Sequence, residues 1–314
     1  AQFLAEMSGT NSPIPMEGNS ITWSPDSKRI AFVSAVPGPE TAEATGDPVV
    51  ITRYLYKPDY SEGMTRFNDN RRLHIYVVDA AGGTPKQLTT GTHSEHSIDW
   101  SPRGDEILFV SNREPNEDQF FNYDIFAVSA ASGQMRRLTA TESAEYQPQW
   151  SPDGKKILFL GTKRGLTDLE TTMEDTHVCV MNADGTGRME LGGVIDNRQT
   201  QAGWAPDGSA VYVAVQERGN RHLRRLPLGG GSGETVVSGG GLLFSWSVSR
   251  GGKLAYSFPR DIVGTLMKIS GVCDANLIYG PYDFYVVANT KTKEALSDLV
   301  MKIRSTKGVT DTVT

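Results

Sequence analysis

A tryptophan-led motif recurs along this chain and constrains its fold more than any other feature. Four copies begin at Trp23, Trp100, Trp150 and Trp204, each with proline two positions later and an apolar residue nine positions later. A looser fifth copy begins at Trp246. Proline fixes φ and glycine accepts positive φ, so the centre of each copy is a tight turn. The apolar run that follows is typical of a buried strand, and each copy therefore predicts a β-hairpin.

A second predicted hairpin follows each of the first four. Its first strand is an alternating segment that leads into a glycine-rich turn, at residues 74–79, 124–129, 177–182 and 222–227. Two hairpins make four strands, which is one propeller blade. The sequence thus predicts a mainly β fold over residues 1–258, a β-propeller of about four full blades plus a partial fifth. An insertion at residues 36–72 separates the first two copies and is either a functional loop or an extra strand pair.

The propeller region resembles known families. Trp150-Ser-Pro-Asp-Gly-Lys followed by Ile157-Leu-Phe is similar to the WD40-like repeats of TolB-type propellers. The stretches 50–57, 71–79 and 110–113 resemble more specifically the propeller of acylaminoacyl peptidases, in the prolyl oligopeptidase family. That resemblance implies a propeller that filters access to a separate α/β-hydrolase domain.

Such a hydrolase needs a nucleophile in the pattern Gly-x-Ser-x-Gly. The nearest string, Gly230-Gly-Ser-Gly-Glu234, lacks the last glycine and lies in a predicted turn. Too few residues follow the propeller to form a hydrolase domain. We therefore expect no catalytic residues and no enzyme activity. The alternative is that the chain is the substrate-gating part of a peptidase of this type, without its hydrolase domain.

The pattern changes at about residue 260. A helix is predicted over 262–269, strands over 275–278 and 284–288, a second helix from Thr292, and a last strand over 309–313. Residues 260–314 are thus predicted to form a small α+β domain. One preceding strand would make it ferredoxin-like. The only candidate, Leu254–Phe258, also closes the fifth propeller repeat.

This C-terminal stretch resembles the effector-binding domain of Lrp/AsnC regulators. The resemblance is carried by residues 267–272, 280–283 and 303–309. It implies domains that pair into a homo-oligomer and bind an amino-acid-like effector, with Gly280, Tyr282 and Asp283 as the ligand-binding positions. The alternative for Asp283 is a tight turn in which it bonds its own backbone. From Arg260 onward, 7 basic residues face 6 acidic ones, so nucleic-acid binding is not expected.

The remaining polar residues have structural explanations. His93 and His96 have the spacing of some metal sites but no evident third ligand, so no metal site and no cofactor is expected. Turn hydrogen bonding explains the aspartates that follow the repeat prolines, which are Asp26, Asp153 and Asp207. A structural role is also expected for the histidines that begin the second hairpins, which are His74, His177 and His222.

Charge and cysteine content complete the expectation. The net charge is −6 and no apolar run is long enough to cross a membrane, so no nucleic-acid or membrane partner is expected. Two distant cysteines, Cys179 and Cys273, predict no disulfide framework and favour a cytoplasmic location. Altogether the sequence predicts a non-catalytic binding or scaffold protein. Its propeller would present a face to a protein or peptide, and its C-terminal module would dimerise and sense an amino acid.

Overall fold

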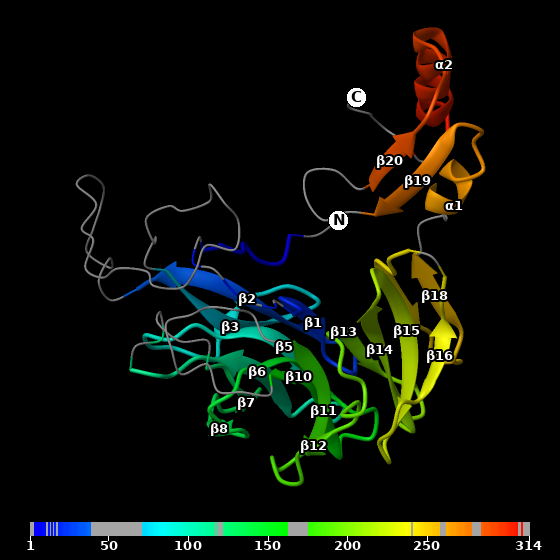
Figure 1. The fold of residues 1–314 in the computed structure, drawn as a ribbon. Helices are drawn as coiled ribbons and strands as arrows, with labels where there is room; N and C mark the ends of the chain where they lie inside the picture. Colours follow the sequence, from blue (N-terminus) through cyan, green and yellow to red (C-terminus); the bar gives the residue numbers. More distant parts are fainter. Residues whose placement is uncertain are drawn as a thin grey trace.

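The computed structural model describes residues 3–10, 12, 14, 16, 18–38, 71–115, 117, 122–162, 175–239, 241–257, 262–277, 284–306 and 309. Four four-stranded antiparallel sheets and one two-stranded sheet follow one another, and a small C-terminal module comes after them (Figure 1). The sheets are the blades of a propeller, numbered one to five in chain order.

The strands have the following bounds. Blade one contains β1 (Ile21–Trp23), β2 (Arg29–Pro37), β3 (Arg71–Asp79) and β4 (Lys86–Gln87). Blade two contains β5 (His96–Trp100), β6 (Glu106–Ser111), β7 (Asp124–Ser129) and β8 (Met135–Arg137). Blade three contains β9 (Glu145–Trp150), β10 (Lys156–Thr162), β11 (Thr176–Asn182) and β12 (Met189–Glu190). Blade four contains β13 (Gln199–Trp204), β14 (Ala210–Glu217), β15 (Asn220–Pro227) and β16 (Glu234–Val237). The partial blade five contains β17 (Ser245–Val248) and β18 (Leu254–Ser257).

This arrangement confirms four full blades and a partial fifth within the described residues. It also decides where the predicted strand Leu254–Phe258 belongs, which the sequence left open between the propeller and the C-terminal module. Leu254 pairs with Val248 and Tyr256 with Trp246, so β18 belongs to the propeller. The described C-terminal residues therefore lack the preceding strand that a ferredoxin-like unit requires, and that fold is not confirmed.

The propeller core lies between neighbouring blades. Three apolar clusters join blades one and two, two and three, and three and four. The tryptophan that ends the first strand of a blade packs in this space: Trp100, Trp150 and Trp204 are only 5%, 6% and 8% exposed. Trp23 is 55% exposed, because no described blade precedes it. Burial between blades, rather than within one sheet, is therefore what stabilises the repeat.

The repeat turns also meet across blades. Each turn glycine lies against the proline of the preceding blade, in the pairs Gly104–Pro25, Gly154–Pro102 and Gly208–Pro152. The turn aspartates behave as the sequence predicts. Asp153 Oδ1 accepts hydrogen bonds from Ser151 Oγ (2.7 Å) and the Lys155 backbone N–H (3.0 Å). These bonds stabilise the charged form and lower the pKa of Asp153.

The C-terminal module contains α1 (Ile262–Leu266), β19 (Val272–Leu277), β20 (Phe284–Ala288) and α2 (Lys293–Arg304). The first helix ends three residues before the predicted Ile269, and Gly271 then turns the chain with φ 100°. The helix α2 begins where predicted, with Thr292 as its N-cap. Both helices contribute to a small core of Leu266, Ala275, Leu299 and Ile303.

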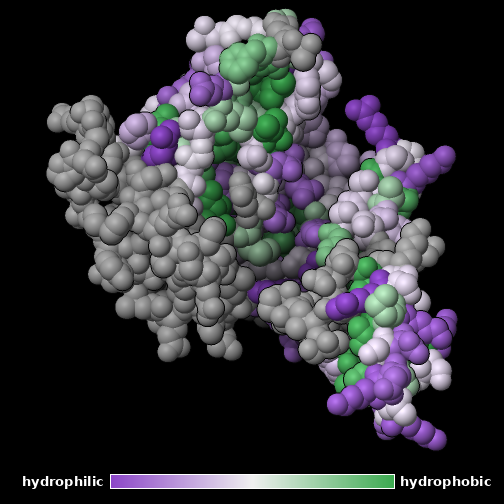
Figure 2. All heavy atoms as spheres, turned by 90° about the horizontal axis from the view of Figure 1, so that it is seen from above, coloured by the Kyte–Doolittle hydropathy of each residue, from purple (hydrophilic) through white to green (hydrophobic). Residues whose placement is uncertain are grey.

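The two faces of this module's hairpin differ in their exposure among the described residues. Val286 and Ala288 pack on the small core, whereas Tyr285 and Val287 are 41% and 49% exposed. Figure 2 shows hydrophobic and hydrophilic residues next to one another on the module, at the lower right.

Two predicted features lie largely outside the described residues. The strand β2 extends to Pro37 and β3 begins at Arg71, and residues 39–70 of the predicted insertion fall between them. The predicted last strand, 309–313, is described only at Val309. Among the helices that the structure describes, none combines the length and the apolar character that a membrane crossing demands.

Candidate functional site

Three residues on the first strands of blades two, three and four adopt an unusual backbone conformation. Ser97, Gln147 and Gln201 have φ of 58°, 51° and 50°, a left-handed conformation that is costly for residues other than glycine. Each stands three positions before its blade's tryptophan, and the pairing register shifts at all three places. These are β-bulges, which turn a side chain away from the regular ladder. We call these three residues the inner rim.

All three inner-rim side chains bind backbone atoms outside their own sheet. The Gly18 N–H donates to Ser97 Oγ (2.8 Å), and Gln147 Nε2 donates to the Met16 carbonyl (3.4 Å). Gln201 Nε2 donates to the Phe244 carbonyl (2.8 Å). The repeated bulge thus presents polar groups that recognise main-chain atoms rather than particular side chains.

The described residues Ile14, Met16, Gly18 and Asn19 of the chain itself lie along the inner rim. Besides the bonds to Ser97 and Gln147, the Asn19 carbonyl accepts a hydrogen bond from the Ile98 N–H (2.8 Å). Ile14 packs on the cluster between blades one and two, and Met16 packs on the cluster between blades three and four. The inner rim therefore already holds a short peptide segment, by backbone bonds and by two apolar side chains.

The fit around Gly18 is close. A Cβ at this position would lie 3.0 Å from Ser97 Cβ, 3.1 Å from Ser97 Oγ and 3.3 Å from Ser97 Cα. Contacts of this length are tighter than most real Cβ contacts, so a side chain at this position would require Ser97 or the segment to shift by a few tenths of an ångström. Glycine is thus the residue that allows the segment to approach the bulge.

Asp99 lies two residues after Ser97 on β5. Its Oδ2 accepts a hydrogen bond from the Trp150 N–H of the next blade (2.7 Å). Burial raises the pKa of Asp99 to about 7, although the backbone bonds from Trp150 and Trp100 act in the opposite direction. The carboxyl group is therefore poised to change charge near neutral pH while it links two blades.

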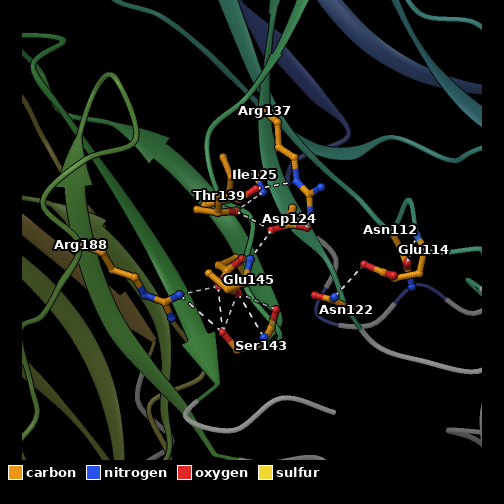
Figure 3. A network of polar contacts seen from close by, with 11 residues as sticks. Asn112, Glu114, Asn122, Asp124, Ile125, Arg137, Thr139, Ser143, Glu145 and Arg188 are labelled. Atoms are coloured by element: carbon orange, nitrogen blue, oxygen red, sulfur yellow. Dashed lines mark hydrogen bonds and ion pairs between the residues drawn. The ribbon is translucent and has the colours of Figure 1, made fainter. Parts of the chain in front are cut away.

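Buried carboxylates also join the blades away from the inner rim. Between blades one and two, Glu95 Oε2 lies 2.8 Å from His74 Nδ1, and Glu95 Oε1 accepts from Arg113 (2.8 Å). Between blades two and three, Glu145 Oε1 accepts from Arg188 and from Thr141, each at 2.8 Å. Figure 3 shows this second network, in which Arg137 binds Asp124 beside Glu145.

The second network differs from the first in its charges. Asp124 occupies the strand position that His74 holds in blade one, and Glu145 Oε2 is buried without a hydrogen-bond partner. Burial raises the pKa of Glu145, and the Asp124 charge raises it further. The positive charge of Arg188 acts in the opposite direction and lowers the pKa of Glu145. These contacts join neighbouring blades.

The predicted histidine and cysteine roles can be compared with the structure. His93 and His96 have different partners, Glu117 Oε2 (3.0 Å) and Ser97 Oγ (2.8 Å). Among the described residues, no three histidine, cysteine or acidic side chains are arranged to hold a metal ion. Cys179 is buried, which raises the pKa of its thiol to about 11, and Cys273 is exposed; both are free thiols.

The predicted ligand-binding residues Gly280, Tyr282 and Asp283 lie outside the described residues. The strands β19 and β20 on either side of them pair with each other, and the ligand-binding role stays a prediction. The inner rim was not predicted. A periodic signal existed, three positions before each tryptophan, but serine and glutamine carry no indication of a left-handed backbone.

Comparison with known proteins supports the propeller. Residues 52–178 match the family model described as the TolB beta propeller domain. Acylaminoacyl peptidase from Pyrococcus horikoshii is similar in structure, with a TM-score of 0.57 and 18% identity over 89% of this chain and 44% of that chain. Oligogalacturonate lyase from Vibrio parahaemolyticus has a TM-score of 0.53 and 13% identity, over 90% of this chain and 64% of that chain. TolB from Acinetobacter baumannii has a TM-score of 0.50 and 18% identity, over 85% of this chain and 54% of that chain.

These likenesses establish a fold. The chain has a β-propeller fold, which over residues 52–178 is similar to the TolB beta propeller domain and which also resembles part of acylaminoacyl peptidase. It spans 44–64% of the length of the three solved structures named above. No curated protein matches it in sequence.

Proposed function

We propose that this chain is a non-catalytic binding protein whose propeller binds a polypeptide segment along the inner rim. The observation that carries this proposal is the chain's own segment at that place, where Ser97 and Gln147 bind the backbone of Gly18 and Met16. Main-chain hydrogen bonds give affinity for many peptide sequences, and apolar contacts add selectivity. The central region of a propeller is also where the blades converge.

A library of randomised nine-residue peptides tests the proposal. The wild-type chain is expected to retain peptides, and the Gln147→Ala, Gln201→Ala double variant is expected to retain far fewer. Gln134→Ala is the matched control, because Gln134 is exposed and lies on the turn before β8. Failure of the wild type to retain any peptide, or equal retention by all three proteins, would contradict the proposal.

A second candidate function is the substrate-gating part of a prolyl oligopeptidase or acylaminoacyl peptidase-type enzyme. The acylaminoacyl peptidase structure that covers 89% of this chain favours it. Both candidates share the propeller and differ in whether a hydrolase acts with it. Under either candidate a fluorophosphonate probe is expected to label no serine of this chain, and labelling with peptide turnover contradicts both. A separate hydrolase that binds the chain and is labelled by the probe supports the second candidate.

We propose a separate role for the C-terminal module. We also propose that the protein is cytoplasmic. The exposed pair Tyr285 and Val287 forms an apolar sheet face of the kind that pairs with a second copy. We propose that the module dimerises there and binds an amino acid at Gly280, Tyr282 and Asp283. Asp283 would accept charge-assisted hydrogen bonds from the ligand's ammonium group.

Light scattering and thermal shift test this role together. We expect a dimer at tens of micromolar protein that becomes a monomer in Val287→Glu, because a buried unpaired charge opposes the contact. At least one of the twenty amino acids is expected to raise the melting temperature of wild type and not of Asp283→Ala. A monomeric wild type contradicts the dimer, and an identical response of Asp283→Ala contradicts the ligand site.

A further inference from the structure

We infer that the inner rim selects short peptides of the pattern apolar–x–apolar–x–glycine, and that the chain's own Ile14, Met16 and Gly18 are its built-in competing occupant. This inference rests on the proposed peptide-binding function and adds to it a ligand pattern and a means of regulation. It follows from three features of the segment as it lies in the structure: its backbone bonds, its two apolar side chains and its glycine.

The backbone bonds fix where a peptide must present its groups. Ser97 Oγ accepts from the N–H at the position of Gly18, and Gln147 Nε2 donates to the carbonyl at the position of Met16. One acceptor and one donor, on neighbouring blades, thus define the direction of the bound chain. A peptide in the reverse direction would present its groups in the wrong order.

The apolar side chains supply the spacing. Ile14 and Met16, two residues apart, pack on clusters that belong to different pairs of blades. A ligand with polar residues at both positions would leave these contacts unmade. Because each contact removes apolar surface from water, the pattern favours two apolar residues separated by one.

The glycine supplies an exclusion of larger residues. A Cβ at the position of Gly18 would lie 3.0 Å from Ser97 Cβ, so any other residue there requires Ser97 or the peptide to shift by a few tenths of an ångström. Such a shift weakens the bond to Ser97 Oγ. Glycine is therefore the favoured residue at the last position of the pattern.

The chain's own segment competes with any added peptide. It is covalently attached, so its effective concentration at the inner rim is high. Met16 has a left-handed backbone with φ 50°, a strain that weakens the hold of the chain's own segment. The apparent dissociation constant of an added peptide increases in inverse proportion to the fraction of chains whose inner rim is open.

The test uses a fluorescent peptide with the sequence of residues 12–20, Ser-Pro-Ile-Pro-Met-Glu-Gly-Asn-Ser. Its affinity is measured for the full-length wild type, Gly18→Ala and Gly9→Ala. Gly18→Ala pushes the chain's own segment off Ser97 and is expected to bind the peptide about tenfold more tightly than wild type. Gly9→Ala is the matched control, because nothing lies within 4 Å of a Cβ at Gly9.

A second peptide, with its glycine replaced by alanine, tests the exclusion and is expected to bind Gly18→Ala at least tenfold more weakly than the first. Equal affinity of wild type and Gly18→Ala for the first peptide, or equal affinity of Gly18→Ala for both peptides, overturns the inference. If library peptides still bind in a Gln147-dependent manner, only the inference fails and the proposed function remains. If no peptide binds any variant, both fail.

Hydrogen exchange gives a readout that needs no substitution. Excess first peptide is expected to displace the segment in the wild type and to speed exchange of the Gly18 N–H, which donates to Ser97 Oγ, at least threefold. The alanine peptide should leave the rate unchanged. An unchanged rate with both peptides contradicts displacement.

Discussion

Replacing Arg188 with methionine is expected to lower the free energy of unfolding by about 3 kcal/mol, the lower end of the range for breaking a buried ion pair. Arg188 Nη1 lies 2.8 Å from Glu145 Oε1, and the Glu145 side chain is fully buried. Methionine keeps much of the apolar volume against Phe159 but removes the charge. The expected loss stays at the lower end because the Arg188 side chain is itself 32% exposed.

Urea unfolding at neutral pH measures this loss, with Arg198→Met as the matched control. Arg198 pairs with Asp175, and both side chains are partly exposed, so the control should lose less than about 1 kcal/mol. Adding Glu145→Gln to Arg188→Met should restore much of the stability, since a neutral amide needs no counter-charge. Equal losses in the two arginine variants would show that Glu145 is not held by Arg188.

The second large effect is a loss of stability as the pH rises. The pKa of Asp99 is raised from 3.8 to about 7, so the folded state holds a proton that the unfolded state releases at lower pH. Its contribution to stability is complete below about pH 4 and is lost as the pH rises through about 7. The shift corresponds to about 4 kcal/mol, at about 1.4 kcal/mol per pKa unit, as an upper bound because solvent partly reaches Asp99.

The Asp99→Asn variant isolates the contribution of Asp99 protonation to stability. The amide oxygen still accepts the Trp150 N–H, and the group no longer titrates. We expect the urea midpoint of wild type to fall between pH 5.5 and pH 8 and that of Asp99→Asn to fall much less. Asp207→Asn is the control, because Asp207 is exposed and its pKa is lowered by its turn bonds. A wild-type slope that Asp99→Asn leaves unchanged would assign the titration to another group.

The propeller was predictable because its signal is local and repeated. Each turn motif fixes its own conformation, and the apolar residues after it fit a strand between two blades. The fifth copy shows the limit of this reasoning. Val248 ends β17, in the position that tryptophan holds in the other blades, and Trp246 stands two residues earlier. Because side chains alternate along a strand, Trp246 lies on the same face of β17 as Val248. The Trp246 side chain therefore still reaches blade four, where its Nε1–H donates to the Gln201 carbonyl (3.0 Å).

The candidate site was not predictable, because it depends on contacts between distant residues. Nothing in the local sequence of Gln147 indicates a bond to Met16, 131 positions away. The closeness of Gly18 to Ser97 likewise arises only when blade one is placed beside blade two. The strand Leu254–Ser257 had two possible partners in the sequence, and only the pairing with β17 decided between them.

Photo-crosslinking tests the central claim, peptide binding at the inner rim, most directly. The residue 12–20 peptide is made with a photoreactive methionine analogue in place of its methionine and is crosslinked to the full-length Gly18→Ala chain. The crosslinked residues are then identified by mass spectrometry. The account predicts crosslinks in β9, β13 and their neighbours in blades three and four, where Met16 packs, and competition by unlabelled peptide. Crosslinks confined to the C-terminal module, or spread over the surface without competition, would contradict it.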